Sequence, residues 1–513
     1  LGEQEGGGHQ SNPYSQRFFR EHDDDILCMA IDPKGRYVAT GQTQSSKSRK
    51  MKPNVKIWDA ESCRPICTLG KFHKRSVTSV AFSADGKWCG TVGGDNNHSV
   101  ALWGSRNGQW NDGKLITTCR GDPGNTFFLS FAGDTNGTFN FVTGGVRHMR
   151  FWNVTGHTMK SKKCILGQNV PPTKAKTIFL TAIGLGRGYF VAGMHSGHIY
   201  LFEGNKLKAF ADAHKSGTGG KTGCQTLHLK TDPTRKQDAE SVQFVSGGSD
   251  GQIILWDFKF PKKGSEPRLE EIRNSRFNIS SITPRPKNHC IKSVCWDGSL
   301  KNILIGTQGS EAYSIGTADG NKINKDKVKL LFSGHYQDEV WGLAPHPVRP
   351  SVVATCGDDM TLRVWRTDQA DHQCLAVGEL LGMSRAVSWK PDGQWLIVGL
   401  GGRVGRKKIT SGRKKKRKNK NNNKKSKKGR QEEEEQNYDG HFMIFEVKQE
   451  LYESSFSNYE MLTPYLDKPQ SLYGDRSNNW ICDVKFSPNG EFVAFCAHDG
   501  RVYLYSTTNM TSK

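Results

Sequence analysis

Long hydrophobic runs are missing from this 513-residue sequence. No apolar stretch approaches the ~18 residues that a membrane-spanning helix needs, and the N-terminus has no secretory signal peptide, so we expect no membrane association. The 13 cysteines contain no Cys-x-x-Cys pair, and their number is odd. These features argue against a zinc framework and a disulfide scaffold, and they favour a reducing compartment, the cytosol or the nucleus. Because the chain begins with Leu1 rather than Met, we expect it to be a piece of a longer protein.

Catalytic signatures are scarce as well. The segment 215–222 resembles a phosphate-binding loop, but Lys215 replaces the first glycine of that motif. The residues beyond it, from Thr226, alternate like a strand, whereas such a loop needs a helix N-terminus facing the phosphates. No nucleophile, base and orienting group occur together, and no two histidines are four residues apart, the helical spacing of a zinc-binding pair. We predict no enzymatic activity, no catalytic residues, no metal and no cofactor. ATP hydrolysis by the purified protein that is lost on Lys221→Ala would instead support an enzymatic function.

Acidic residues are absent from one long basic stretch. Between Arg403 and Arg430 there are 16 Lys or Arg and no Asp or Glu, while the net charge of the whole chain is +23. Subtracting those 16 charges leaves +7, so the remainder is only mildly basic. The extreme charge is therefore a property of one segment rather than of the fold.

The sequence is rich in glycine, with 57 residues, and in short apolar stretches. An apolar stretch, a turn such as Asp392-Gly393 or Asn489-Gly490, a second apolar stretch ending in Gly, and a third ending in an aromatic residue recur along the chain. The third-strand aromatics are Trp58, Trp103, Trp152, Phe202, Trp256, Trp365, Phe445 and Tyr505. A degenerate copy lies at 303–315, which makes nine units in all.

A period of ~40–50 residues with three or four short strands is typical of β-propeller blades. One such sheet cannot bury both of its faces alone, whereas radial stacking buries each face against a neighbour and ring closure protects the edges. We therefore predict an all-β fold, a WD-repeat β-propeller with one complete ring of about seven blades and the start of a second propeller. One larger ring is the alternative.

One unit carries a more specific pattern. Gly334-His335, Thr355, Asp359 and Trp365 resemble a WD repeat with its internal hydrogen-bond chain. The resemblance implies that Asp359 accepts from His335, which contacts Thr355 and, through it, Trp365. The role is structural, because a buried polar network is costly when any member lacks a partner.

A longer segment supports a family resemblance. Residues 334–347, GHYQDEVWGLAPHP, are similar to the characteristic repeat of the echinoderm microtubule-associated-protein-like family, as are 36–42 with 53–59 and 141–152. The resemblance covers roughly 15–510 and implies tandem propellers that bind microtubules. The expected domains are an N-terminal segment 1–20, a first propeller 21–380, and blades 381–513 that begin a second propeller.

A basic insertion at 403–437 separates two strands of one expected blade. It has almost no apolar residues, so we expect it to be disordered. Its candidate contacts to an acidic polymer are Arg413, Lys414, Lys415, Lys416, Arg417, Lys418, Lys424, Lys425, Lys427 and Lys428. The same residues are compatible with a nuclear-localisation or RNA-binding patch or with a merely solvated insertion. No aromatic residue lies within 413–430, which argues against base stacking and disfavours a nucleic-acid partner.

Two functions follow from these observations. The first is a non-enzymatic microtubule-associated scaffold of the cytoplasmic cytoskeleton, including cilia or the axoneme. It would bind tubulin, through the acidic tails in particular, by propeller surfaces and the polybasic loop, together with other cytoskeletal or axonemal proteins. The alternative is a nuclear or nucleolar WD-repeat scaffold of an RNA-processing complex, with the basic run as localisation signal. The likeness at 334–347 favours the first.

Overall fold

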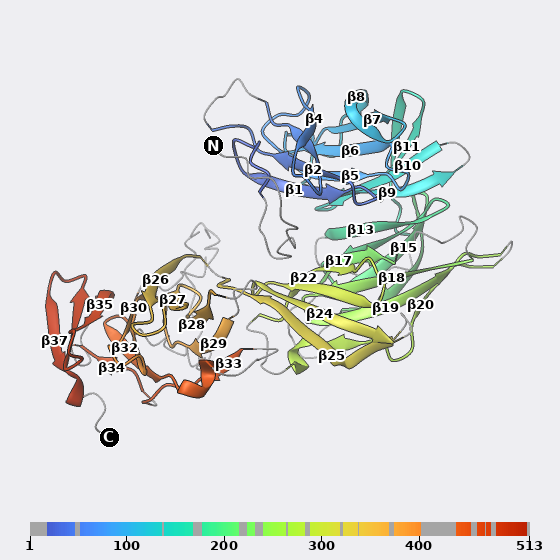
Figure 1. The fold of residues 1–513 in the computed structure, drawn as a ribbon. Helices are drawn as coiled ribbons and strands as arrows, with labels where there is room; N and C mark the ends of the chain where they lie inside the picture. The colour runs from blue at the N-terminus through green and yellow to red at the C-terminus, as the bar shows by residue number, and fades with distance from the viewer. Residues whose placement is uncertain are drawn as a thin grey trace, which may run out of the picture. The chain divides into compact units, whose positions relative to one another are not determined.

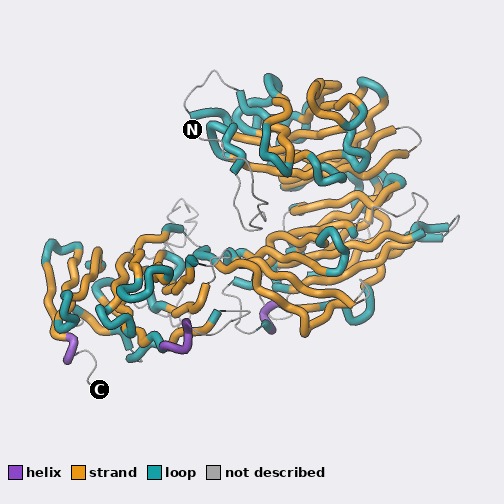
Figure 2. Tube along the Cα trace, viewed as in Figure 1, coloured by secondary structure: helices purple, strands orange, loops and turns teal. Residues whose placement is uncertain are grey.

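A computed structural model describes residues 18–509 of the chain, apart from 47–51, 136–137, 168–176, 215–222, 231–239, 263–264, 283–287, 319–321, 337, 369–373, 402–437, 453–458, 467 and 473–478. Strands and their connections make up this part of the protein (Figure 2). Its helical segments are three single 3₁₀ turns, Ile279–Ser281, Gln449–Tyr452 and Thr507–Asn509. The chain divides into two compact units, Leu1–Leu331 and Phe332–Lys513.

The first unit contains six antiparallel sheets, whose strands are labelled in Figure 1. The sheets are β1 (Ile26–Ile31), β2 (Tyr37–Gln42), β3 (Val55–Asp59) and β4 (Pro65–Leu69); β5 (Val77–Phe82), β6 (Trp88–Gly93), β7 (Val100–Arg106) and β8 (Gln109–Cys119); β9 (Thr126–Thr135), β10 (Thr138–Gly145), β11 (Met149–Thr155) and β12 (Thr158–Lys163); β13 (Phe179–Gly186), β14 (Tyr189–Met194), β15 (His198–Glu203) and β16 (Lys206–Asp212); β17 (Cys224–Leu229), β18 (Ser241–Gly248), β19 (Gln252–Lys259) and β20 (Arg268–Glu271), with β21 (Phe277–Asn278) beside β19; and β22 (Ile291–Trp296), β23 (Asn302–Thr307), β24 (Glu311–Ala318) and β25 (Lys322–Ser333).

The second unit contains three sheets. They are β26 (Val340–Pro345), β27 (Val352–Gly357), β28 (Thr361–Arg366) and β29 (Cys374–Glu379), with β33 (Glu460–Leu462) parallel to β29; β30 (Ser384–Trp389), β31 (Trp395–Leu400), β32 (His441–Glu446) and β34 (Gln470–Ser471); and β35 (Ile481–Phe486), β36 (Phe492–Ala497) and β37 (Val502–Ser506). Strands β31 and β32 pair with each other, so the basic insertion joins two neighbouring strands of one sheet, as expected.

The burial of the strands follows from the stacking of sheets. All six residues of β2 and all six of β14 are buried, whereas β16 alternates between exposed and half-buried residues. A central strand is covered on both faces only when each face of its sheet packs against another layer. This explains why β2 and β14 are continuous runs of buried, mainly apolar and small residues rather than alternating ones.

The core is divided among the interfaces between successive sheets. In the described residues, seven clusters of buried apolar side chains each join one sheet to the next in chain order. In one of them, Ile57 of β3 packs in the same cluster as Val77 of β5 and Trp103 of β7. Each sheet is therefore stabilised mainly by its neighbours, as in other stacked repeats.

The predicted turns and the degenerate unit are present. At Asp392-Gly393 the glycine has a φ of +72° and its N–H donates to the carbonyl of Lys390 at 2.9 Å, and Gly490 has the same φ. This left-handed conformation favours glycine. The degenerate copy predicted at 303–315 forms β23 and β24 of a four-stranded sheet. The expected domain boundary between 380 and 381 stays a prediction, while the division into compact units falls within β25.

Candidate functional site

The four residues of the WD-type pattern come together in the sheet β26–β29. His335 Nε2 lies 2.8 Å from Thr355 Oγ1, and His335 Nδ1 lies 3.0 Å from Asp359 Oδ1. The indole N–H of Trp365 donates to Thr355 Oγ1 at 2.7 Å. Because that hydroxyl accepts from the indole, its own proton is free to bond to Nε2 of His335. His335 then carries its proton on Nδ1 and donates it to Asp359.

Further donors surround the carboxylate of this network. The hydroxyl of Thr361 donates to Asp359 at 2.8 Å, and the buried Arg363 donates to Thr361 and, at 2.7 Å, to Ser333. Burial on its own would raise the pKa of Asp359, but the hydrogen bond and charge of His335, the Thr361 hydroxyl and the charge of Arg363 hold it below its ordinary value. The side chain is 0% exposed, and because its pKa is lowered, this carboxylate stays ionised in the interior.

A second network of the same kind lies in the sheet β5–β8, where the sequence analysis did not place one. His73 Nε2 is 2.7 Å from Thr91 Oγ1, which also accepts from the Trp103 indole at 3.0 Å. On the other side of the ring, Nδ1 lies 3.2 Å from the hydroxyl of Ser99, which donates to the carboxylate of Asp95. The serine thus relays the contact that aspartate makes directly in β26–β29.

Two more sheets of the first unit carry related networks. In β17–β20, His214 bonds to Ser246 at 2.8 Å and lies 3.1 Å from Asp250, and Trp256 donates to Ser246 at 2.9 Å. This set is complete, with serine in place of threonine.

In β1–β4, His22 bonds to Thr40 at 2.7 Å and Trp58 donates to Thr40 at 3.1 Å, but Gln42, 2.6 Å from the ring, takes the place of the aspartate. Related networks therefore occur in four of the nine described sheets, and the full set with a direct His–Asp contact occurs in two of them, β17–β20 and β26–β29.

The sequence signal for these networks was present but different from the one sought. The histidines follow Glu21, Phe72 and Ala213 instead of the glycine of a Gly-His pair. The hydroxyl residue lies 10 positions before the tryptophan in Ser246 and Trp256 and 12 in Thr91 and Trp103. A search for Ser or Thr at this spacing before Trp, with His upstream, would have found the sets of His73 and His214 but not that of His22, because Thr40 lies 18 positions before Trp58.

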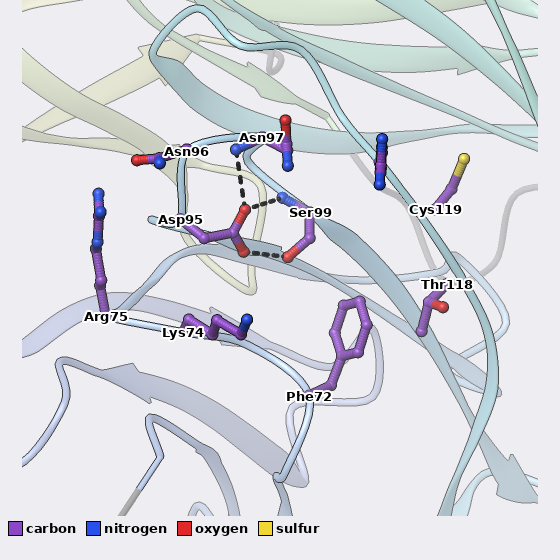
Figure 3. A pocket seen from close by; sticks show the side chains of 10 residues that line it. Phe72, Lys74, Arg75, Asp95, Asn96, Asn97, Ser99, Thr118 and Cys119 are labelled. Carbon is purple, nitrogen blue, oxygen red and sulfur yellow. Dashed lines mark hydrogen bonds between the residues drawn. The ribbon is translucent and has the colours of Figure 1, made fainter. Parts of the chain in front are cut away.

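A pocket opens beside the second network, on the same sheet. Its volume is about 630 Å³, and Figure 3 shows the side chains that line it. They come from three segments of the chain: the β4–β5 connection, the β6–β7 turn and the end of β8. The lining residues are Phe72, Lys74, Arg75, Asp95, Asn96, Asn97, Ser99, Thr118, Cys119 and Arg120.

The β6–β7 turn is fixed by its single acidic residue. Asp95 accepts from the backbone N–H groups of Asn97, at 3.1 Å, and Ser99, at 3.2 Å, and from the Ser99 hydroxyl, as the dashed lines in Figure 3 show. Burial opposes ionisation of Asp95, but these hydrogen bonds keep its pKa below the ordinary value. The carboxylate is thus engaged within its own turn.

Close backbone packing brings this turn against the β4–β5 connection. The N–H of Gly94 donates to the carbonyl of Ser76 at 2.8 Å, and a Cβ at Gly94 would lie 2.0 Å from the Ser76 hydroxyl oxygen. A larger residue at this position would require the Ser76 hydroxyl to turn away. The turn and the connection are thus joined by a backbone hydrogen bond at the wall of the pocket.

The basic residues predicted to bind an acidic polymer, at 413–418, 424–425 and 427–428, lie outside the described residues. So does the segment 215–222 that resembles a phosphate-binding loop, although β17 begins directly after it, at Cys224, as a strand and not a helix. Within the described part of the chain, no three His, Cys, Asp or Glu side chains are grouped so that they could hold a metal ion. Nor do the described residues include a helix long and apolar enough to cross a membrane.

Comparison with known families gives two matches. The model of the echinoderm microtubule-associated protein first beta-propeller matches residues 15–315, and that of the WD domain, G-beta repeat, matches 326–366 and 467–506. The first of these covers more than half of the chain.

Three curated relatives are similar over almost the whole chain. Echinoderm microtubule-associated protein-like 2 of Homo sapiens is 23% identical over 499 residues, which are 96% of this chain and 60% of that protein. Echinoderm microtubule-associated protein-like 1 of Mus musculus is 23% identical, with 96% and 48% covered. The 77 kDa echinoderm microtubule-associated protein of Strongylocentrotus purpuratus is 22% identical, with 96% and 57% covered. The chain therefore spans about half to three fifths of the length of these relatives.

Two solved structures match this chain at low identity and with TM-scores below 0.5. The Cps50 (Swd1) beta-propeller domain of Myceliophteria thermophila is 13% identical, with a TM-score of 0.37 and 74% of this chain and 94% of that chain covered. The RRP9 WD40 repeats are 17% identical, with a TM-score of 0.34 and 76% and 92% covered. The predicted all-β, WD-repeat propeller fold is confirmed by the sheets and the family matches, while the number of blades in a ring stays a prediction.

Proposed function

The chain belongs to the echinoderm microtubule-associated protein family, and we propose that it acts as a non-enzymatic scaffold that binds microtubules. The observation that carries this proposal is the likeness to proteins named as microtubule-associated over 96% of the chain. The proposed location is the cytoplasmic cytoskeleton, including cilia or the axoneme. The proposed partners are tubulin and other cytoskeletal proteins.

The fold supports a scaffold because it offers firmly held surfaces. Stacked sheets with buried hydrogen-bond networks at Thr40, Thr91, Ser246 and Thr355 hold the strands, and the loops between them present side chains to partners. Buried networks whose members are all satisfied make a fold rigid and specific. The histidines of these networks bridge backbone segments. They do not position the reacting groups of an enzyme.

The basic segment supplies the proposed electrostatic part of binding. Its 16 positive charges between Arg403 and Arg430 face no acidic residue within that stretch. Tubulin carries acidic C-terminal tails, and many weak, salt-screened contacts between exposed charges can add up to useful affinity. We propose that residues 413–418, 424–425 and 427–428 bind those tails while the propeller surfaces contact the folded part of tubulin.

Co-sedimentation with taxol-stabilised microtubules tests this function. The purified chain should pellet with microtubules at low salt and less at physiological salt, and tubulin with cleaved acidic tails should bind it more weakly. If correctly folded protein does not pellet under any of these conditions, the microtubule function is wrong for this chain. Such a result would favour the nuclear scaffold with the basic run as a localisation signal.

A further inference from the structure

We propose that the pocket of the sheet β5–β8 is a binding site for an acidic peptide segment, one with several Asp or Glu side chains along an extended backbone. The pocket lies next to the His73 network but is not filled by it. Its volume of about 630 Å³ is within the ~300–1,000 Å³ of ordinary ligand pockets. This inference rests on the proposed function, because a microtubule partner would supply the acidic peptide.

The pocket has an excess of unpaired positive charge. Lys74, Arg75 and Arg120 are exposed, and among the described residues no carboxylate forms an ion pair with any of them. The one acidic lining residue, Asp95, already accepts hydrogen bonds from Asn97 and Ser99. Three cationic side chains against one engaged carboxylate make the site attractive to anions.

Arg75 is held in a strained conformation at the edge of this pocket. Its φ is +66°, and the N–H of Ser76 donates to the carbonyl of Lys74 at 2.9 Å, which makes Arg75 the centre of a γ-turn with a left-handed central residue. That form of the turn is rare and strained for a residue other than glycine. The carbonyl of Arg75 accepts from Gln44 at 2.6 Å, so the connection is held by the neighbouring sheet as well. Backbone strain at Arg75 favours a functional role for its side chain.

The arrangement favours a ligand with several charges over a single phosphate. Figure 3 shows Arg75 on one side of the pocket and Thr118 and Cys119 on the other, and Arg120 follows Cys119 directly in the chain. The cationic lining residues therefore belong to chain segments on both sides of the pocket. Between them, Phe72 offers an apolar surface, on which the methylene groups of Glu side chains can pack.

The lining amides suit a peptide backbone. Asn96 and Asn97 are exposed in the β6–β7 turn, and each amide can both donate and accept. Carboxylates of the peptide would bond to Arg75 and Arg120, because a planar guanidinium group can donate to both oxygens of one carboxylate. An acidic peptide satisfies both kinds of group.

Binding of fluorescein-labelled hexaglutamate, followed by anisotropy at physiological salt, tests the site. The full chain is compared with a version lacking 403–430, so that the basic segment does not mask the pocket. In both, Lys74→Gln/Arg75→Gln/Arg120→Gln removes three charges from the pocket. The matched control, Lys160→Gln/Lys162→Gln/Lys163→Gln, removes three exposed charges from β12. In the version lacking 403–430 we expect the pocket variant to bind about tenfold or more weakly and the control within about twofold.

A benzophenone-bearing hexaglutamate locates the bound peptide on the unmodified full chain. Crosslinks are expected at 70–76, 94–99 or 118–120 and should disappear in the pocket variant. Equal loss of affinity in the pocket and control variants, or crosslinks only elsewhere, would overturn the proposal. A phosphoserine peptide without Asp or Glu that displaces the probe better than unlabelled hexaglutamate would overturn the carboxylate assignment. Microtubule pelleting by the same variants is scored separately. Unchanged hexaglutamate binding in the pocket variant, with pelleting intact, would reject the pocket and leave the proposed function standing, whereas failure of the unmodified chain to pellet would reject the proposed function.

Discussion

The sheets β5–β8 and β26–β29 use the same hydrogen-bond scheme in two different ways. In β26–β29 the ring of His335 contacts Asp359 directly, whereas in β5–β8 Ser99 stands between His73 and Asp95. The direct contact places a carboxylate that is 0% exposed beside the histidine, while Asp95 remains half-buried in a turn beside a pocket. The relayed network thus leaves one face of its turn available for a ligand.

Burial also sets the charge state of the histidine in the sheet β5–β8. Burial lowers the pKa of His73 to about 4, against only a weak opposing effect of Asp95. His73 is therefore neutral at physiological pH, and it bridges two backbone segments without carrying a charge. The two sheets share the hydroxyl bonded to histidine and tryptophan, whereas the carboxylate contacts the histidine directly in one sheet and through Ser99 in the other.

Removing the two carboxylates should have the largest and most unequal effect. We expect Asp359→Ala to lower the local free energy of unfolding by about 3 kcal/mol, because His335 and Thr361 lose a buried ionised acceptor. Asp95→Ala should cost only about 1 kcal/mol, since its donors can turn to water. Native-state hydrogen exchange of β27–β28 and of β6–β7, respectively, measures both. Equal losses would contradict the distinction between direct and relayed networks.

Removing the shared hydroxyl should affect both sheets alike. Thr355→Val and Thr91→Val each leave a histidine nitrogen and an indole N–H without a partner, so we expect about 2 kcal/mol of destabilisation for each. Thr117→Val on β8 is the matched control and should change the stability by less than about 0.5 kcal/mol. Hydrogen exchange of the same strands gives the answer. A loss in one sheet only would show that the hydroxyl is not the common element.

Acid should weaken β5–β8 through His73. Its folded-state pKa of about 4 lies below the ordinary 6.5, so the unfolded chain takes up a proton first as the pH falls from 6.5 towards 4. The stability from neutral His73 is present above pH 6.5 and is lost through that window, with about 1.4 kcal/mol lost by pH 5.5. Urea unfolding at pH 7.5 and 5.5 tests this, and His73→Gln should show a smaller difference between the two pH values. An unchanged pH dependence in that variant would rule out His73 as its source.

The smallest expected effect separates stability from binding. Arg75→Gly removes the left-handed strain of +66° but makes the unfolded chain more flexible, so we expect a net gain of about 0.5 kcal/mol. Arg120→Gly, at a position without positive φ, should be neutral or destabilising. Thermal unfolding compares them, while both should weaken hexaglutamate binding. A clear loss of stability in Arg75→Gly would mean that the arginine holds the turn and that the strain has no link to a ligand.

The repeats could be predicted from the sequence because each leaves a local signal. Strand and turn residues recur with the same spacing, so the degenerate unit at 303–315 and the turn at Asp392-Gly393 were found without tertiary information. The set around His335 was found because it keeps the Gly-His pair. The sets around His73 and His214 were missed because the residue before a histidine in the loop is free to vary, while the bonds to Thr91 and Ser246 persist.

The pocket could not be predicted, for a different reason. Its walls come from 72–75, 95–99 and 118–120, which approach one another only when β4, β6 and β8 have packed. None of these segments has a motif of its own, and the strain at Arg75 appears only in the folded backbone. Charge alone pointed instead to the stretch 403–430, whose 16 basic residues dominate the composition.

The most direct test of a scaffold that binds through its folded surface is the pelleting of the chain lacking 403–430 with stabilised microtubules at physiological salt. Its control is the unmodified chain in the same experiment, with circular dichroism to verify that both are folded. We predict that the deleted form still pellets, with lower affinity and a weaker dependence on salt. If it stays in the supernatant at every tubulin concentration while the unmodified chain pellets, the propeller surface is not the binding surface, and the basic segment alone carries the interaction.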